Sequence, residues 1–152
     1  MLGHYYFFDP NYYQINGYDL FLSLRTSGNR GGVAIYVNDT FSSKQLFHES
    51  YFVNNVLESC VLEISIPGKQ KITLLNCYRP PQHPSFTIQE SKKWFLEIFP
   101  DVLDIFCTRG NPLIVSGDFN LNLHELIQND NGLVSDFVDI MASYGFIPVK
   151  IR

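Results

Sequence analysis

The segment at 112–120, Pro-Leu-Ile-Val-Ser-Gly-Asp-Phe-Asn, constrains the fold more than any other part of the chain. Its apolar run at 113–115 follows a Gly-Asn-Pro turn, and this pattern predicts a strand buried on both faces. The run ends at Gly117, and Asp118 and Asn120 follow two positions apart. Because side chains alternate along an extended chain, we expect both polar groups to project together into whatever cleft lies beyond the strand.

The Gly-Asp-Phe-Asn string allows two interpretations. Gly, Asp and Asn favour turns and helix caps through local hydrogen bonds, so the string can be a simple turn. A carboxylate beside a carboxamide at a strand end also suits chemistry: the first orients water and accepts its proton, and the second donates to an anion without adding negative charge. The string alone leaves both interpretations open.

The residues before this segment predict two β-hairpins. Residues 18–24 and 33–37 alternate as strands do and flank a polar, Gly-rich turn, so they are expected to pair. Residues 57–66 and 71–78 form the second predicted hairpin. Its Pro-Gly turn has the residue order of a type II turn.

Two helical regions are also predicted. Thr87 and Glu90 form a capping box that opens the first helix, and Pro100 is expected to kink this helix or restart it. An amphipathic helix is expected at 133–144 with Gly145 as its stop, followed by another extended segment at 146–151. Hairpins followed by helices between later strands predict an α/β or α+β sandwich.

Composition restricts the class of protein. Hydrophobic residues make up 45% of the chain and charged residues 17%, which indicates one globular domain over 1–152. The net charge of -4 argues against a broad basic surface for nucleic acid, although a few phosphates could be held locally. The three cysteines, expected to pack as small hydrophobes, and the four histidines show no metal-ligand spacing. With neither a signal segment nor a membrane span, we expect a protein of the nucleus or cytoplasm that is not secreted.

Three motifs occur in a fixed order: Arg-Gly-Gly-Val-Ala-Ile-Tyr-Val at 30–37, Asn-Cys-Tyr-Arg-Pro-Pro at 76–81 and Gly-Asp-Phe-Asn at 117–120. Together they resemble the endonuclease/exonuclease/phosphatase superfamily. More narrowly, the chain resembles the endonuclease domain at the front of jockey-like non-LTR retrotransposon polyproteins. The similarity runs from about residue 17 to the C-terminus, and three motifs in register are more specific than any one of them.

The resemblance implies a fold and an activity. The fold would be α/β (α+β), a partial four-layer sandwich of two mainly antiparallel β-sheets packed face to face with flanking helices. The activity would be Mg2+-dependent (or Mn2+-dependent) DNA endonuclease cleavage that nicks a target site to prime reverse transcription, with a reverse transcriptase domain downstream in the parent polyprotein. A phosphatase of the same superfamily is the alternative enzyme, which the motifs at 30–37 and 76–81 disfavour.

The resemblance also assigns roles to residues. Asp118 would orient the attacking water and is a candidate metal ligand, and Asn120 would contact a phosphoryl oxygen. Tyr78 would contact the scissile phosphate, with a core aromatic role as its alternative. Arg79 is a candidate for binding substrate phosphate, but packing at the surface over a sheet edge is the interpretation that we favour for it.

Two features of the family are missing from the sequence. The metal-anchoring glutamate should precede the motif at 30–37, but the first glutamate in the chain is Glu49. No Ser-Asp-His string occurs, because Ser135-Asp136 is followed by Phe137. We therefore expect the middle portion of a truncated domain that is inactive alone, since catalytic groups that act as a unit fail together. A non-catalytic remnant or interaction module is the alternative.

Overall fold

The computed structural model describes residues 9–24, 32–46, 52–53, 56–81, 87–121 and 132–147, and the structural statements below concern these residues. They form a two-stranded antiparallel sheet, β1-β2, and a five-stranded sheet in the order β3-β5-β6-β7, with β4 beside β5. The strands are β1 (Tyr18–Ser23), β2 (Val33–Asn38), β3 (Ser42–Gln45), β4 (Phe52–Val53), β5 (Leu57–Ser65), β6 (Ile72–Tyr78) and β7 (Leu113–Asp118). The helices are a short 3-10 turn (Pro10–Tyr13), α1 (Ile88–Cys107) and α2 (Gly132–Ser143).

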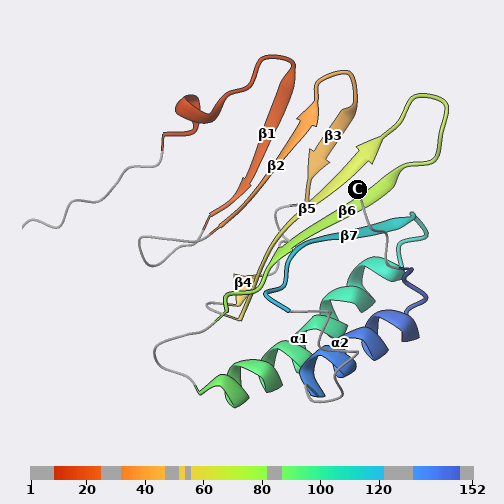
Figure 1. Cartoon of the computed structure of the whole chain (residues 1–152). Helices are drawn as coiled ribbons and strands as arrows, with labels where there is room; N and C mark the ends of the chain where they lie inside the picture. Colours follow the sequence, from red (N-terminus) through yellow and green to blue (C-terminus); the bar gives the residue numbers. More distant parts are fainter. Residues whose placement is uncertain are drawn as a thin grey trace, which may run out of the picture.

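The elements are arranged in layers (Figure 1). The β1-β2 sheet lies against one face of the five-stranded sheet, and α1 and α2 lie against the other. This confirms the expected α+β sandwich of two facing sheets with helices. In the described part of the chain the helices cover one side only, so three layers are seen.

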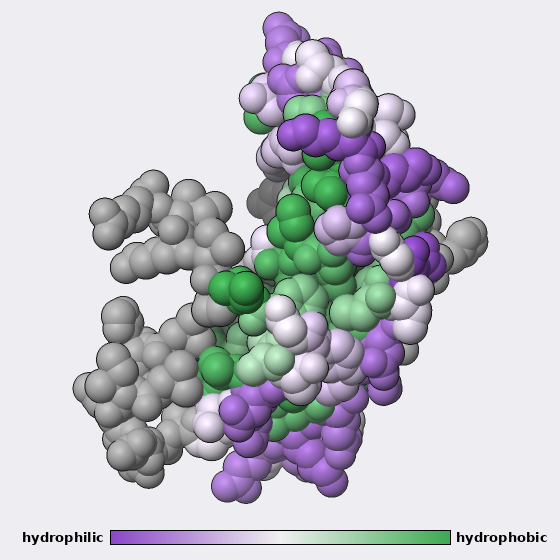
Figure 2. Space-filling view, turned by 90° about the vertical axis from the view of Figure 1, so that its right-hand side faces the viewer, coloured by the Kyte–Doolittle hydropathy of each residue, from purple (hydrophilic) through white to green (hydrophobic). Residues whose placement is uncertain are grey.

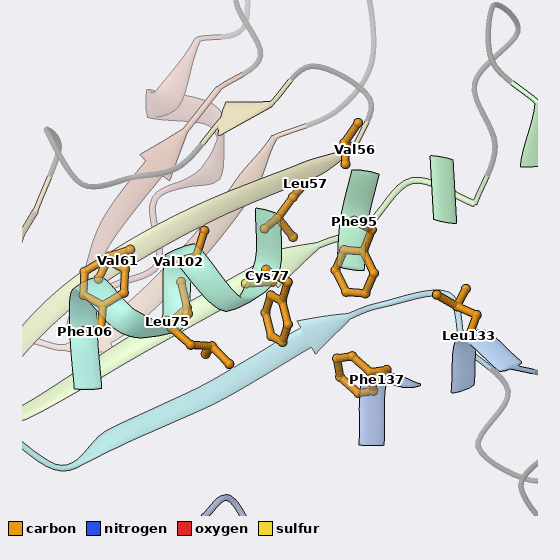
Figure 3. Packing of buried hydrophobic residues seen from close by; sticks show 12 residues of the cluster. Val56, Leu57, Val61, Leu75, Cys77, Phe95, Val102, Phe106, Leu133 and Phe137 are labelled. Atoms are coloured by element: carbon orange, nitrogen blue, oxygen red, sulfur yellow. The ribbon is translucent and has the colours of Figure 1, made fainter. Parts of the chain in front are cut away.

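Alternation along β5 explains why it can separate two cores. Leu57 and Val61 point into the helix-side core, and Cys60 and Leu62 point into the sheet-side core formed with β2. The helix-side core is the larger one, and Figure 3 shows its aromatic and aliphatic side chains between the strands and the helices. Such a strand is apolar on both faces because a layer covers each face.

The connection from β6 through α1 to β7 sets up the functional edge of the sheet. β6 and β7 run parallel, and α1 forms the crossover between them. Parallel strands end at the same edge, so the Tyr-Arg-Pro-Pro and Gly-Asp-Phe-Asn motifs lie side by side there. Between the two motifs, residues Ile88–Cys107 form this helix, which packs against the sheet.

Most of the predicted elements are confirmed. β1 pairs with β2, and β5 pairs with β6 around a turn in which Gly68 has a φ of 71° and Lys69 N donates to Ile66 O, as expected for type II. The capping box is present, with the Thr87 side chain accepting from Glu90 N and the Glu90 side chain accepting from Thr87 N.

Other expectations are wrong. α1 does not restart at Pro100 but continues as one helix from Ile88 to Cys107, with the helix-side core holding residues on both sides of the proline, whereas the other expected outcome, a kink at Pro100, stays a prediction. Cys107 is exposed and does not pack as a small hydrophobe, although the other two cysteines are buried. β7 is not buried on both faces: Ile114 is 48% exposed, because β1-β2 packs over β5 and β6 and does not extend over β7. The four histidines and most of the expected strand at 146–151 lie outside the described residues.

Candidate active site

The parallel register of β6 and β7 places Tyr78 directly opposite Asp118. Residues paired across two strands point to the same face of the sheet, so both side chains lie on the face toward the β1-β2 layer. Two residues earlier on the same face, Ser116 Oγ donates to Asn76 Oδ1 at 3.0 Å. The two motifs are therefore brought together by strand pairing, and a polar strip leads along the strands to the site.

The loop after β7 is held by its own side chains. Asn120 N donates to Asp118 Oδ1 at 3.0 Å, and Asn120 Nδ2 donates to Arg79 O at 2.7 Å. Asn120 has a φ of 49°, a left-handed conformation that asparagine tolerates better than most residues. The Gly-Asp-Phe-Asn string therefore does form a turn. Its polar groups at the strand end are still accessible to a substrate, since Asp118 and Asn120 are both exposed.

Phe119 connects this loop to the helix-side core. Its ring lies 5.0 Å from the Phe137 ring and 5.6 Å from the Phe99 ring, between centroids. The residues on either side of Phe119 face solvent while its ring packs inward. Buried aromatic contacts thereby fix the position of the polar pair.

Arg79 lies on the opposite face of the sheet from Tyr78. It is 4% exposed, its guanidinium carbon lies 5.3 Å from the centre of the Phe95 ring, and its Nη1 donates to Phe119 O at 3.2 Å. The expected packing at the surface is therefore wrong, because α1 covers this side of the strand end. Burial lowers the pKa of Arg79, but a guanidinium stays charged at neutral pH even so. Its side chain does not share the face on which Tyr78 and Asp118 meet.

Glu58 is a residue that the sequence analysis missed. It pairs with Tyr78 across β5 and β6, so Glu58, Tyr78 and Asp118 form one row across three strands. The side chain is fully buried, and its Oε2 accepts from Gly32 N at 2.6 Å. This hydrogen bond ties the last residue of the Gly-rich turn to the sheet. The sequence does carry a signal for Glu58, because a lone carboxylate stands in the otherwise uncharged start of an apolar strand. A carboxylate buried in such a strand requires a buried partner.

The described residues do not form a preformed magnesium site. Within them, no group of three or more His, Cys, Asp or Glu side chains is placed to hold a metal ion. Among the described residues at the end of β7 and just beyond it, Asp118 is the only carboxylate, and one of its oxygens already accepts from Asn120 N. A site for Mg2+ needs more oxygen ligands than this, usually with phosphate oxygens and water among them.

The thiol nearest to the site is not suited to nucleophilic chemistry. Cys77 directly precedes Tyr78, and its side chain is buried in the helix-side core. Burial raises the pKa of this thiol to about 12, so it stays protonated at neutral pH. Of the two carboxylates described in the row with Tyr78, Glu58 is buried and Asp118 is exposed, so Asp118 is the one that can act as a base on a substrate.

Comparison with protein-family models, with curated proteins and with solved structures finds no match to this chain. None of the described helices has the length and apolar character needed to cross a membrane. The function must therefore be argued from the three motifs and from the geometry of the strand ends.

Proposed function

We propose that the ends of β6 and β7 form the phosphodiester-binding part of a DNA endonuclease site, as the three sequence motifs imply. The observation that carries this proposal is the pairing of Tyr78 with Asp118 on one face of two parallel strands, with Asn120 fixed beside them. The motifs that contain Tyr78 and Asp118 are about forty residues apart in sequence, so sequence proximity does not explain why they meet at one edge of the sheet.

Hydrolysis of a phosphodiester requires an oriented water, stabilisation of the charge that develops on phosphorus oxygens and assistance for the leaving oxygen. The second carboxylate oxygen of Asp118 can hold and deprotonate the water. The Tyr78 hydroxyl and the second amide hydrogen of Asn120 can donate to phosphoryl oxygens. None of the groups described on this face is a cation that could neutralise the developing negative charge. The proposed Mg2+ or Mn2+ would have to supply that positive charge when bound.

The test is nicking of supercoiled plasmid DNA with and without Mg2+, together with calorimetric titration of the metal. We expect no robust nicking by the isolated chain, whose sequence lacks the metal-anchoring glutamate and the Ser-Asp-His string, and any Mg2+-dependent nicking above background should fall by about 100-fold or more in Asp118→Ala, the usual contribution of a general base. Asp139→Ala is the matched control, because Asp139 is an exposed carboxylate on α2 away from the strand ends.

Measurable nicking that is unchanged in Asp118→Ala would contradict the proposal, as would the absence of any calorimetric signal for Mg2+ in the presence of DNA. The second result would favour a non-catalytic interaction module. One observation supports that alternative: the outer side of the β1-β2 sheet is a hollow lined mainly by apolar residues, among them Leu20, Leu22 and Ala34. Gel filtration separates the two cases, since a module that needs a partner on this face should self-associate when alone.

A further inference from the structure

One peptide group links the buried and the exposed parts of the strand end. The carbonyl of Phe119 accepts from Arg79 Nη1 at 3.2 Å. The N–H of the same peptide belongs to Asn120 and donates to Asp118 Oδ1 at 3.0 Å. Because a peptide group is planar, fixing the direction of its carbonyl also fixes the direction of its N–H.

This peptide group is held in an unfavourable conformation. Asn120 has a φ of 49°, and a left-handed non-glycine residue persists only where its surroundings determine it. Rotation of the peptide about its two flanking bonds would relieve the left-handed φ and would turn the N–H away from Asp118. The hydrogen bonds that Asn120 donates to Asp118 Oδ1 and to Arg79 O oppose that rotation, and a contact on the carbonyl side would oppose it further.

The Arg79 guanidinium is placed to oppose it. Arg79 is only 4% exposed, and stacking of its guanidinium over the Phe95 ring at 5.3 Å restricts the directions in which the side chain can point. Its Nε has no hydrogen-bond partner among the described residues, and within them Phe119 O is the acceptor that its guanidinium contacts. A hydrogen bond from a charged donor is stronger than one between neutral groups, and it is stronger still when water is excluded.

We propose that Arg79 is a positioning residue that locks the Phe119–Asn120 peptide, and through it the orientation of the Asp118 carboxylate, without touching substrate. Two main-chain contacts assist: Arg79 N donates to Asp118 O at 2.9 Å, and Arg79 O accepts from Asn120 Nδ2 at 2.7 Å. Arg79→Met and Arg79→Lys keep this main-chain donor and acceptor, so the guanidinium can be tested separately from the backbone. The catalytic consequence of the lock rests on the proposed function, whereas the lock itself does not.

The experiment compares Arg79→Met, Arg79→Lys and Arg109→Met. Methionine keeps the apolar stem and removes the donors, and lysine keeps the charge for the case in which Arg79→Met does not fold. Arg109 is the matched control, because its guanidinium also stacks on a phenylalanine ring, that of Phe106 at 5.5 Å, but at the other end of α1. The readouts are backbone and side-chain amide NMR signals of Asn120, hydrogen exchange of its N–H, and plasmid nicking.

We expect Arg79→Met to speed hydrogen exchange of the Asn120 N–H by about tenfold or more, the loss expected for a hydrogen bond to a charged group. Arg79→Lys should have a smaller effect, and Arg109→Met none. If the chain nicks DNA, Arg79→Met should lower kcat with little change in KM. Unchanged Asn120 signals with a raised KM would overturn the proposal, because they would indicate direct contact with DNA. A chain that gives no calorimetric signal for Mg2+ in the presence of DNA counts against the proposed function alone, since the Asn120 signals still decide on the lock whether or not the chain nicks.

Discussion

The two faces of the five-stranded sheet differ in how completely they are covered. On the helix side, α1 and α2 enclose Phe95, Phe99 and Phe106, all of which are fully buried. On the other side, the β1-β2 sheet covers β5 and β6, and Ile114 on β7 is left 48% exposed. Figure 2, which shows the right-hand side of the molecule in Figure 1, has hydrophobic residues gathered across the middle of this side between hydrophilic margins.

The candidate site lies at the strand ends, where the covered helix side of the sheet meets the opposite side, which is covered only in part. Tyr78 packs at the edge of the sheet-side core, whereas Asp118, on the next strand, is exposed. Phe119 turns the other way, into the fully covered helix-side core. The stability of the strand end is thus supplied from the helix side, and its polar groups are presented on the side where the cover ends.

The largest effect that tests this comparison should come from Phe99→Ala. The Phe99 ring has no exposed surface and contacts the rings of Phe95, Phe119 and Phe137 at 5.2, 5.6 and 5.6 Å between centroids. Removing a fully buried phenylalanine ring should lower the free energy of unfolding by about 3–5 kcal/mol. Urea denaturation measures the loss.

Ile114→Ala is the counterpart on the open side of the sheet. A half-exposed side chain loses only part of its burial on truncation, so we expect the free energy of unfolding to fall by about 1 kcal/mol or less. A loss as large as that of Phe99→Ala would contradict the comparison, because it would mean that the β7 face is covered in solution.

An effect smaller than that of Phe99→Ala, but more local, is expected from Gly117→Ala. Gly117 pairs with Cys77 one step before the Tyr78–Asp118 pair and has a φ of 140°. A methyl group there would lie 1.8 Å from Cys77 O, so β7 would have to move away from β6. We expect a loss of about 1–3 kcal/mol in urea denaturation from such overpacking, together with shifted NMR signals of Tyr78 and Asp118.

Gly68→Ala separates backbone conformation from the steric clash. Gly68 also has a left-handed φ, 71°, but nothing lies within 4 Å of a Cβ placed there. Its substitution should cost about 1 kcal/mol, from backbone strain alone. NMR signals of Tyr78 and Asp118 that shift equally in both variants would show that the close approach of β6 and β7 does not position the pair.

The sequence predicts local structure well where the signal is short-range. The Pro-Gly turn before Lys69 and the capping box of Thr87 and Glu90 are confirmed because each depends on neighbouring residues. The burial of β7 is predicted wrongly, since three apolar residues in a row look the same in a central strand and in an edge strand. Which strand lies at an edge is decided by pairing between distant segments.

The same limit applies to the candidate site. Asp118, Asn120 and Tyr78 were found from motifs, and strand register places Tyr78 and Asp118 on one face. Arg79 was assigned to the surface because arginine usually lies there, and only the packing of α1 over the strand end buries it. Glu58 was missed because its position in the row with Tyr78 depends on the antiparallel register of β5 and β6.

The smallest expected effect compares the two faces through one buried thiol on each. Cys60 lies in the sheet-side core and Cys77 in the helix-side core, and burial raises the pKa of these thiols to about 11 and about 12. Neither forms a thiolate near neutral pH while the protein is closed, so labelling by a thiol reagent reports local opening. Variants that each keep one of the three cysteines allow the two rates to be measured separately.

Cys60 should be labelled about tenfold faster than Cys77, because a two-stranded sheet opens more easily than a helical layer packed on the larger core. Cys107 is exposed and provides the reference for a thiol that needs no opening, although its pKa is also raised, chiefly by desolvation. Equal rates for the two buried thiols would mean that both faces open together by global unfolding. The uneven cover of the sheet would then be a static feature, and the strand end at β7 would be no easier to expose than the helix-side core beneath it.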